Sequence, residues 1–185
     1  MTTNVPIEPV EIQPTAITEA LAPITAIAGV SWSAASPPPA AKGLKILLIA
    51  PTIFKLPLQG YGGTEAIVLS LAEQFTKAGH QVTVVAPEGS VLPEGIELLA
   101  VGLGETEEGA FAKYRSRLAE FDIIHDHTFG SWVYLESVGV DPPLPIIKTH
   151  HTDPSIWASP PPVPHPCMVG ISTDHAHRLS LAYGI

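Results

Sequence analysis

The loop around Gly62 and Gly63 is the first place in the sequence where chemistry is expected. The two glycines belong to the stretch Gly60-Tyr61-Gly62-Gly63-Thr64-Glu65, which lies between an apolar, strand-like run and an amphipathic helical pattern. Glycines there leave backbone N–H groups uncovered, and these groups, with the positive end of the helix, favour an anion such as a phosphate. The alternative is that the glycines only turn the chain.

Histidines follow two later strands of the predicted sheet. His125 and His127 are two residues apart on one strand, so they face the same side, and His151 ends the next strand. A neutral imidazole at His151 can donate to a phosphate or a sugar hydroxyl, and a protonated one can balance charge. Two alternatives stay open: the three imidazoles serve as zinc ligands, or they are hydrogen-bonded structural histidines.

The elements that position these residues alternate between strand and helix. Strands are predicted over residues 44–50, 81–86, 96–101, 121–127, 145–151 and 167–172, and helices over 64–78, 105–120, 130–138 and 173–183. This alternation predicts an α/β fold, a doubly wound, Rossmann-like parallel sheet. Ligands bind such sheets beyond the carboxyl ends of the strands, where the glycine loop and both groups of histidines fall.

Residues 1–42 form a separate, Pro-rich leader ahead of the domain predicted over residues 43–185. Proline recurs through the leader and forms the triplet Pro37-Pro38-Pro39 near its end. This proline content excludes a long helix. The composition favours a flexible or polyproline-like segment. Its apolar residues leave a second interpretation, an arm that packs on a partner.

Charge and composition limit the classes of partner. The 185 residues include 9 Lys+Arg against 18 Asp+Glu, a formal net charge of −9. Non-specific nucleic-acid binding needs a basic face, so we expect no nucleic-acid partner. Cys167 is the only cysteine, which excludes an intrachain disulfide and a cysteine-based zinc cage. We expect a cytoplasmic protein with no transmembrane segment, and peripheral membrane contact stays open.

Three familiar nucleotide and hydrolase motifs do not fit. A dinucleotide fingerprint places its glycines directly after the first strand, whereas Pro51 follows that strand here. The sequence has no G-K-[ST] of a nucleoside triphosphatase and no G-x-S-x-G elbow of a hydrolase.

Several motifs in the same order resemble the N-terminal, acceptor-side domain of the retaining glycosyltransferases of family 4, which have the GT-B fold. The resemblance covers about residues 44–185 and rests on four stretches besides the first strand. These are the glycine loop with the following helix and strand, Asp122-Ile123-Ile124-His125-Asp126-His127, Pro145-Ile146-Ile147-Lys148-Thr149-His150-His151-Thr152, and Val169-Gly170-Ile171-Ser172.

The resemblance implies roles for individual residues. Gly62 and Gly63 would lie near the diphosphate and the transferred sugar of a nucleotide-sugar, and His151 would match the catalytic-site histidine that contacts that sugar. His127 would line the acceptor side, where the acceptor is a sugar, a lipid or a small molecule. Thr64 and Asp153 complete the expected substrate-binding set. The family generally needs no metal or other cofactor.

The resemblance also implies a second half of the site. In the family a C-terminal domain holds most of the nucleotide-sugar with an Arg/Lys pair and paired glutamates, which do not occur before Ile185. We therefore expect a donor domain or partner subunit, with little activity from this chain alone. Near the expected cleft only Lys55 and Lys148 are candidate cations, and Lys148 points away from His151. The alternatives are a non-catalytic binding module or one subunit of a split glycosyltransferase.

Overall fold

The computed structural model describes residues 43–58, 60, 62–137, 143–153 and 167–183, so the predictions for the leader 1–42 lie outside it. Within these ranges the strands are β1 (Lys45–Ile49), β2 (Gln81–Pro87), β3 (Ile96–Val101), β4 (Ile123–Asp126), β5 (Ile146–His150) and β6 (Met168–Gly170). The helices are α2 (Gly63–Lys77), α3 (Glu107–Tyr114), the 3-10 helix η1 (Arg115–Glu120), α4 (Trp132–Ser137) and α5 (Thr173–Tyr183).

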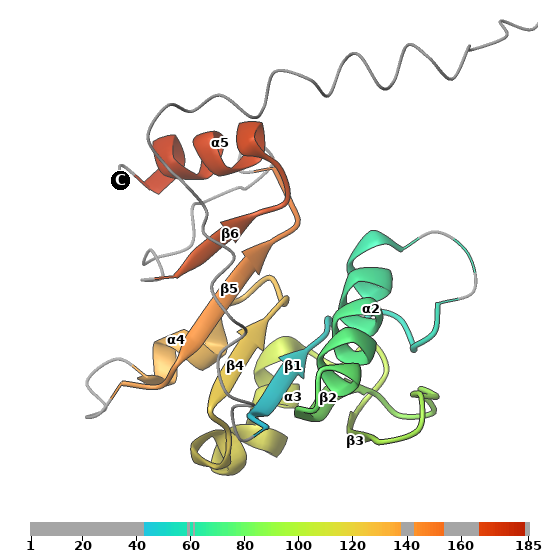
Figure 1. Ribbon diagram of the computed structural model, residues 1–185. Coiled ribbons are helices and arrows are strands. Elements are labelled where there is room, and N and C mark those ends of the chain that lie inside the picture. Colours follow the sequence, from blue (N-terminus) through green and yellow to red (C-terminus); the bar gives the residue numbers. More distant parts are fainter. Residues whose placement is uncertain (1–42, 59, 61, 138–142, 154–166, 184–185) are drawn as a thin grey trace, which may run out of the picture. The chain divides into compact units, whose positions relative to one another are not determined.

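The six described strands form one sheet in the order β3-β2-β1-β4-β5-β6, and every neighbouring pair is parallel (Figure 1). The order runs outward in both directions from β1, so the chain reverses direction across the sheet between β3 and β4. This arrangement confirms the predicted Rossmann-like α/β fold. It also brings the carboxyl ends of β1, β4 and β5 to neighbouring places on one edge.

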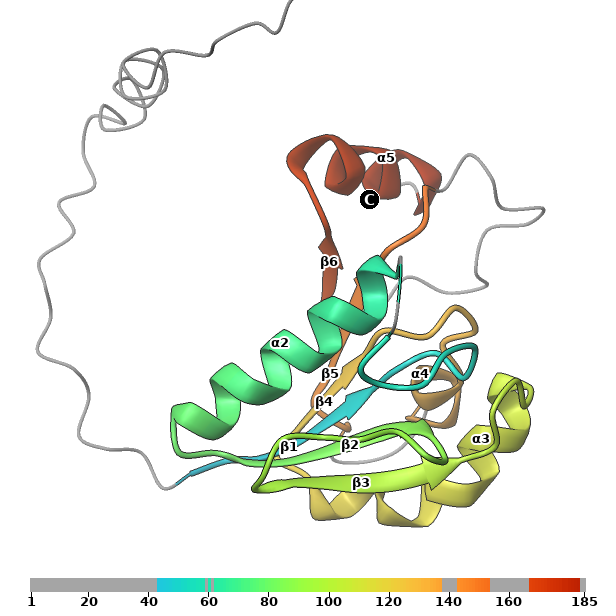
Figure 2. The same ribbon diagram turned by 90° about the vertical axis from the view of Figure 1, so that its right-hand side faces the viewer.

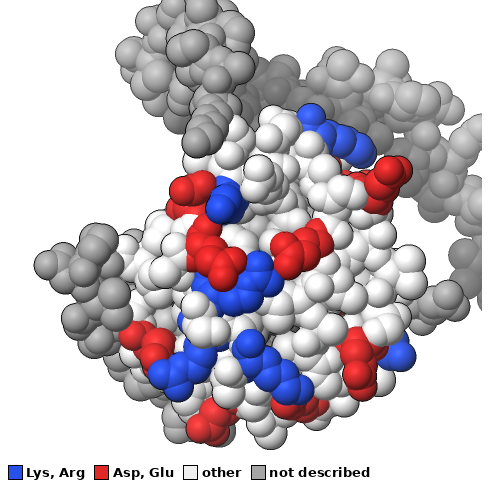
Figure 3. Space-filling model, turned by 90° about the horizontal axis from the view of Figure 1, so that it is seen from below, with Lys and Arg blue, Asp and Glu red and all other residues white. Residues whose placement is uncertain are grey.

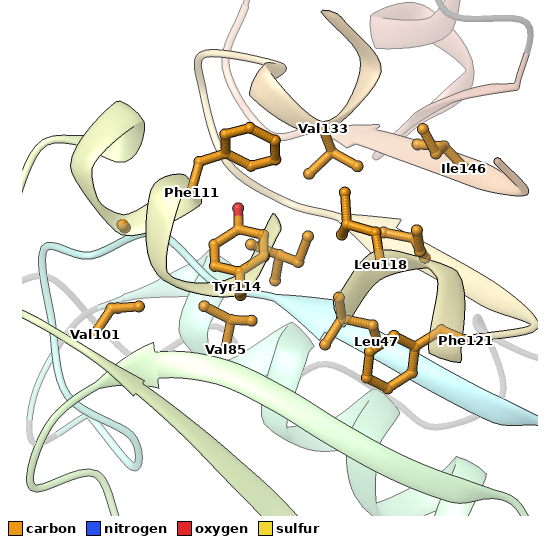
Figure 4. Close-up of a cluster of buried hydrophobic side chains, with 12 residues drawn as sticks. Leu47, Val85, Val101, Phe111, Tyr114, Leu118, Phe121, Val133 and Ile146 are labelled. Atoms are coloured by element: carbon orange, nitrogen blue, oxygen red, sulfur yellow. The ribbon is translucent and has the colours of Figure 1, made fainter. Parts of the chain in front are cut away.

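Helices cover both faces of the sheet, with α2 on one face and α3 and α4 on the other (Figure 2). Two apolar clusters hold these layers together. The cluster on the α2 face joins the even-numbered residues of β1 and β2 to Val68 and Ala72 of α2. The other joins Leu47 and Val85 to Phe111 and Tyr114 of α3, whose rings meet edge to face at 5.5 Å (Figure 4). Strands covered on both faces account for their near-continuous apolar sequence.

Backbone geometry sets both ends of α2. Gly62 caps the helix with extended backbone and no side-chain cap, and its carbonyl accepts from Ala66 N–H at 3.3 Å. At the other end Gly79 takes the left-handed conformation, φ +90°, which a glycine adopts without strain. The helix therefore starts and stops where the glycines in the sequence predict, within one residue.

The predicted helix over residues 105–120 is two elements. Thr106 caps α3 by accepting from Gly109 N–H, and after Tyr114 the chain tightens into η1. The tighter turn carries Leu118 into the cluster beneath α3, so packing overrides the continuous helical pattern. The predicted helix over 130–138 starts at Trp132, because Ser131 has φ 56°, outside the helical region.

Charged side chains on the face seen from below are interspersed, with acidic groups beside basic ones (Figure 3). Ion pairs among the described residues include Arg115 with Glu136 and Arg117 with Glu97 and Glu120. A basic stripe of the kind that binds nucleic acid is not formed on this face. Among the described helices, none is both long enough and apolar enough to cross a membrane.

Candidate functional site

The adjacent glycines Gly62 and Gly63 differ in the space around them. A Cβ added to Gly62 would lie 1.9 Å from Leu58 Cδ2 and 2.8 Å from Glu65 Oε2. A Cβ on Gly63 would meet nothing within 4 Å, and Gly63 is exposed with no positive φ. Gly62 is therefore fixed by close packing against its own loop. Among the described residues, nothing covers the space beside Gly63, the first residue of α2.

The structure also places Thr64, Glu65 and Gly60 of the same stretch. Thr64 is half-buried in the first turn of α2, and Glu65 beside it is buried, at 5% exposure. A carboxylate in the first turn is favoured by the helix dipole, which explains Glu65 without a catalytic role. Gly60 has φ +124°, a conformation that favours glycine, and Gly62 has extended backbone.

The histidines of β4 and β5 meet on the α2 face of the sheet. Nδ1 of His127 lies 2.8 Å from Nε2 of His151, and Nε2 of His125 lies 2.7 Å from Oγ1 of Thr149. The rings of His125 and His127 are tilted against each other with centroids 4.1 Å apart. The prediction that His125 and His127 share a face is confirmed. The structure also brings His127 and His151 into direct contact, a pairing that spacing along the chain does not reveal.

Burial keeps these imidazoles neutral. It lowers the pKa of His127 to about 2, with further lowering by His125 and His151. Burial likewise lowers the pKa of His151 to about 4, with Lys148 and neighbouring histidines acting in the same direction. The pKa of His125 falls to about 4, again mainly through burial. At neutral pH the cluster therefore carries hydrogen-bonding groups without charge.

The opposite face of the same strands holds a buried ion pair. Lys148 Nζ lies 3.0 Å from Asp126 Oδ2, and both side chains are fully buried. Burial alone would raise the pKa of Asp126, but Lys148 and hydrogen bonds from Thr128 outweigh it and lower the pKa overall. The prediction that Lys148 and His151 point to opposite faces is confirmed. Lys148 is wrong as a candidate cation of the cleft, because Asp126 and Thr128 enclose its ammonium group.

This pair also shapes the loop after β4. Asp126 Oδ1 accepts from both the N–H and the hydroxyl of Thr128, at 2.8 and 2.7 Å. Lys148 Nζ donates to the Thr128 carbonyl. Further along, Phe129 and Gly130 donate their N–H groups to Glu107 in the first turn of α3. The loop that carries His127 out of β4 is therefore tied at successive residues to the interior and to α3.

A pocket of about 280 Å³ opens beyond β5, lined by His151, Asp153, Ile171, Ser172, Asp174 and His175. Buried His175 accepts from Ile171 N–H at Nδ1, at 3.2 Å, and its Nε2 lies 3.0 Å from the Thr152 carbonyl. Asp153 pairs with Arg178 at 3.1 Å, so its predicted substrate contact would compete with this ion pair. Sequence reasoning missed His175, whose place in an amphipathic helix resembles that of any core residue.

A larger groove of about 780 Å³ lies elsewhere, lined mostly by apolar residues such as Leu58, Leu69 and Val91. Lys55, the other candidate cation, borders this groove. It extends over Gly89, where an added Cβ would lie 2.8 Å from its Nζ. None of the six predicted site residues lines this groove. The residues that could do chemistry are thus gathered at the ends of β4 and β5 and at the start of α2.

The geometry gives no support to a shared zinc ion. His127 and His151 direct nitrogens at each other, so these two nitrogens are engaged in a hydrogen bond instead of converging on a common point. Across the part of the chain that the structure describes, no group of three or more His, Cys, Asp or Glu side chains is arranged to hold a metal ion. What the arrangement offers is a set of neutral donors and acceptors.

Comparison with protein families identifies the family of this domain. The family model described as Glycosyltransferase Family 4 matches residues 61–166, which include α2, the strands β2 to β5 and all three histidines of the cluster. The chain belongs to glycosyltransferase family 4. A comparison with curated proteins gives no match. The matched region is the N-terminal domain of such enzymes, in agreement with a six-stranded parallel sheet.

Within this family 4 domain the predicted site residues fall into two groups. His127 and His151 form one contact at the ends of β4 and β5. Gly62, Gly63 and Thr64 lie at the start of α2, which packs on the same face of the sheet. The roles of these residues toward a substrate remain predictions.

Proposed function

We propose that this chain forms the acceptor-side half of a retaining glycosyltransferase that moves a sugar from a nucleotide-sugar to an acceptor hydroxyl. One observation carries the proposal. In a family 4 domain, a neutral imidazole, His151, stands at the carboxyl edge of the sheet with one nitrogen held by His127. An uncharged hydrogen-bond donor at this edge is suited to bind a sugar hydroxyl. It is less suited to act as a nucleophile or as a metal ligand.

The start of α2 would bind the phosphate part of the same substrate. The first backbone N–H groups of a helix have no hydrogen-bond acceptor within the helix. They can bind a phosphate group, and the helix dipole adds to the attraction. The open surface above Gly63 lets a phosphate approach those N–H groups. Thr64, half-buried in the same turn, adds a hydroxyl.

The departing nucleoside diphosphate needs more positive charge than this edge supplies. Catalysis of such a step depends on fixed groups aimed at the developing charge. Lys148 is the only Lys or Arg in β4 and β5, and Asp126 neutralises it in the interior. A donor-binding domain or partner subunit would therefore supply the cations and most of the nucleotide contacts. By itself, the 185-residue chain should turn over far more slowly than the ~1 per second of ordinary enzymes.

The experiment is a transfer assay with the chain alone and with a donor-binding domain of the same family, fused or co-expressed. A panel of nucleotide-sugars is scored for acceptor-dependent nucleotide release. We expect release only in the combination. Binding of a sugar acceptor without transfer in any combination would instead favour a non-catalytic binding module. Rapid release by the chain alone would overturn the need for a second domain.

The variant Gly63→Val tests the phosphate site inside this assay. Its side chain would project into open space, so we expect the fold to survive while transfer falls at least about tenfold, because the ligand surface is blocked. Ala66→Val is the matched control, since it adds the same branched side chain at an exposed position of α2. Equal activity of the two variants would remove the phosphate site from the proposal.

A further inference from the structure

The contact between His127 and His151 contains a single proton whose position can be deduced. Their facing nitrogens, Nδ1 of His127 and Nε2 of His151, are 2.8 Å apart, a normal hydrogen-bond distance. One nitrogen must donate and the other accept. Both rings are neutral at neutral pH, so each carries one proton in total. Only two arrangements are left, and they differ in which ring is the donor.

Burial of the far side of His127 decides between them. His127 is 1% exposed, and its Nε2 has no hydrogen-bond partner among the described residues. If His151 donated, the proton of His127 would sit on this Nε2 as a buried N–H with no acceptor, which is rare in proteins. If His127 donates from Nδ1, its Nε2 is a bare nitrogen that holds no unpaired proton. The second arrangement is therefore the favoured one.

The consequence falls on His151. With its Nε2 accepting from His127, the proton of its neutral ring must be on Nδ1. His151 is half-buried and borders the pocket of about 280 Å³ beyond β5. No described residue hydrogen-bonds to its Nδ1, so this N–H is available to a ligand.

We infer that His127 is a positioning residue that holds His151 in its Nδ1–H tautomer, so that His151 presents a hydrogen-bond donor and not a base to its ligand. The identity of that ligand, a sugar hydroxyl or phosphate oxygen, rests on the proposed function, whereas the tautomer does not. Proton abstraction from an acceptor hydroxyl by this ring is excluded in this state, since its basic nitrogen faces His127.

The residue after His151 is held by an independent contact. His175 accepts the Ile171 N–H at Nδ1, so this nitrogen is bare and the ring proton on Nε2 is donated to the Thr152 carbonyl. Thr152 is thereby fixed directly beyond His151. The imidazole of His151 is consequently positioned from two sides, through its ring by His127 and through the following backbone by His175.

Nitrogen NMR of the imidazole rings in the isotope-labelled, full 185-residue chain tests the tautomer directly, because protonated and bare ring nitrogens have well-separated chemical shifts. Signals are assigned by single histidine substitutions. At neutral pH we expect a protonated Nδ1 and a bare Nε2 for His151. A protonated Nε2 on a neutral His151 ring, or a doubly protonated ring, would overturn the inference.

Variants of His127 distinguish a positioning role toward His151 from a role in packing alone. His127→Phe retains an aromatic ring without a donor, and we expect the Nδ1–H preference of His151 to be lost. His127→Asn offers an amide N–H near the place of Nδ1 and should restore it. Thr149→Val removes the partner of His125 and should leave His151 unchanged. If His127→Phe does not fold, the spectra of the wild type and of His127→Asn still decide which nitrogen of His151 carries the proton.

The same samples distinguish failure of the inference from failure of the proposed function. Nucleotide-sugar is titrated into the combination of chain and donor-binding domain. The expected tautomer with no ligand effect in any combination would reject the transferase proposal and leave the role of His127 intact. Transfer by a protein whose His151 carries its proton on Nε2 would reject the role of His127 alone.

Discussion

Two faces of the same pair of strands solve the problem of buried polar groups in different ways. On the α3 face, Asp126 and Lys148 form a fully buried ion pair. On the α2 face, burial holds His125, His127 and His151 neutral. His127 and His151 share a hydrogen bond, and His125 bonds Thr149 instead. The alternation of side chains along β4 and β5 separates the two solutions by a single residue.

The difference predicts different roles for the two faces. A buried ion pair with its hydrogen bonds satisfied holds its surroundings rigidly, and here it fixes the loop after β4. Neutral imidazoles can exchange one hydrogen-bond partner for another without the cost of burying a charge. We therefore expect variants on the α3 face to change stability and variants on the α2 face to change ligand contacts.

The largest effect is expected from Lys148→Met. This change leaves Asp126 buried with its charge unpaired, and breaking such a pair on one side typically costs about 3–5 kcal/mol of unfolding free energy. Chemical denaturation measures the loss. The double variant Asp126→Asn with Lys148→Met should regain much of it, because no unpaired charge is left. If the double variant is no more stable than Lys148→Met, the uncompensated charge is not the cause.

The next effect tests the α2 face through catalysis. In a combination that transfers sugar, His151→Phe should lower kcat/KM up to about tenfold, because one hydrogen bond to a neutral hydroxyl typically contributes about 0.5–1.5 kcal/mol. Unfolding free energy should change much less than in Lys148→Met. His151→Asn, which keeps a donor, is the matched variant. A loss of stability in His151→Phe as large as that of Lys148→Met would break the distinction between the two faces.

The pH dependence of stability sharpens the comparison further. His127 has a pKa of about 2 when folded, against about 6.5 for a free histidine. Between these values the unfolded chain binds a proton that the folded chain excludes, so unfolding free energy falls as the pH drops below about 6.5. One such histidine accounts for up to about 1.4 kcal/mol per pH unit.

His127→Phe removes this contribution. We expect its unfolding free energy to decline less steeply than that of the wild type between about pH 6 and pH 5, by ~1 kcal/mol over that interval. Denaturant titrations at both pH values give the two slopes. Equal slopes would mean that His127 takes up a proton in the folded state, in conflict with its deep burial.

The sequence was sufficient for the fold and for the sharing of faces. Apolar runs and helical periods located every described strand, and the period of two placed His125 with His127 and separated Lys148 from His151. It was not sufficient to predict which side chains contact each other. His127 and His151 directly follow β4 and β5, and their contact depends on the register between these strands, which no local pattern encodes.

The same limit explains the error over Lys148. A lysine near the end of a strand is usually exposed, and only the register that places Asp126 opposite Lys148 shows that its charge is taken up inside. The steric roles of the glycines were likewise hidden. Gly62 and Gly63 look equivalent in sequence, yet only Gly62 is crowded, because Leu58 folds back over it.

The smallest effect is expected from an exposed ion pair, which serves as the reference for Lys148. Arg115 pairs with Glu136 at 2.9 Å, and both side chains are about half exposed. Arg115→Met replaces a long cationic side chain with methionine, as Lys148→Met does. The Glu136 carboxylate that loses its partner, however, stays hydrated. Exposed pairs typically contribute less than about 1 kcal/mol, so the unfolding free energy should change by no more than that. Adding salt should shrink this difference, because exposed charges are screened, whereas the effect of Lys148→Met should persist. Denaturation of both variants at low and high salt measures the contrast. If Arg115→Met cost as much as Lys148→Met, burial would not be what distinguishes the ion pair beneath the histidines from those on the surface.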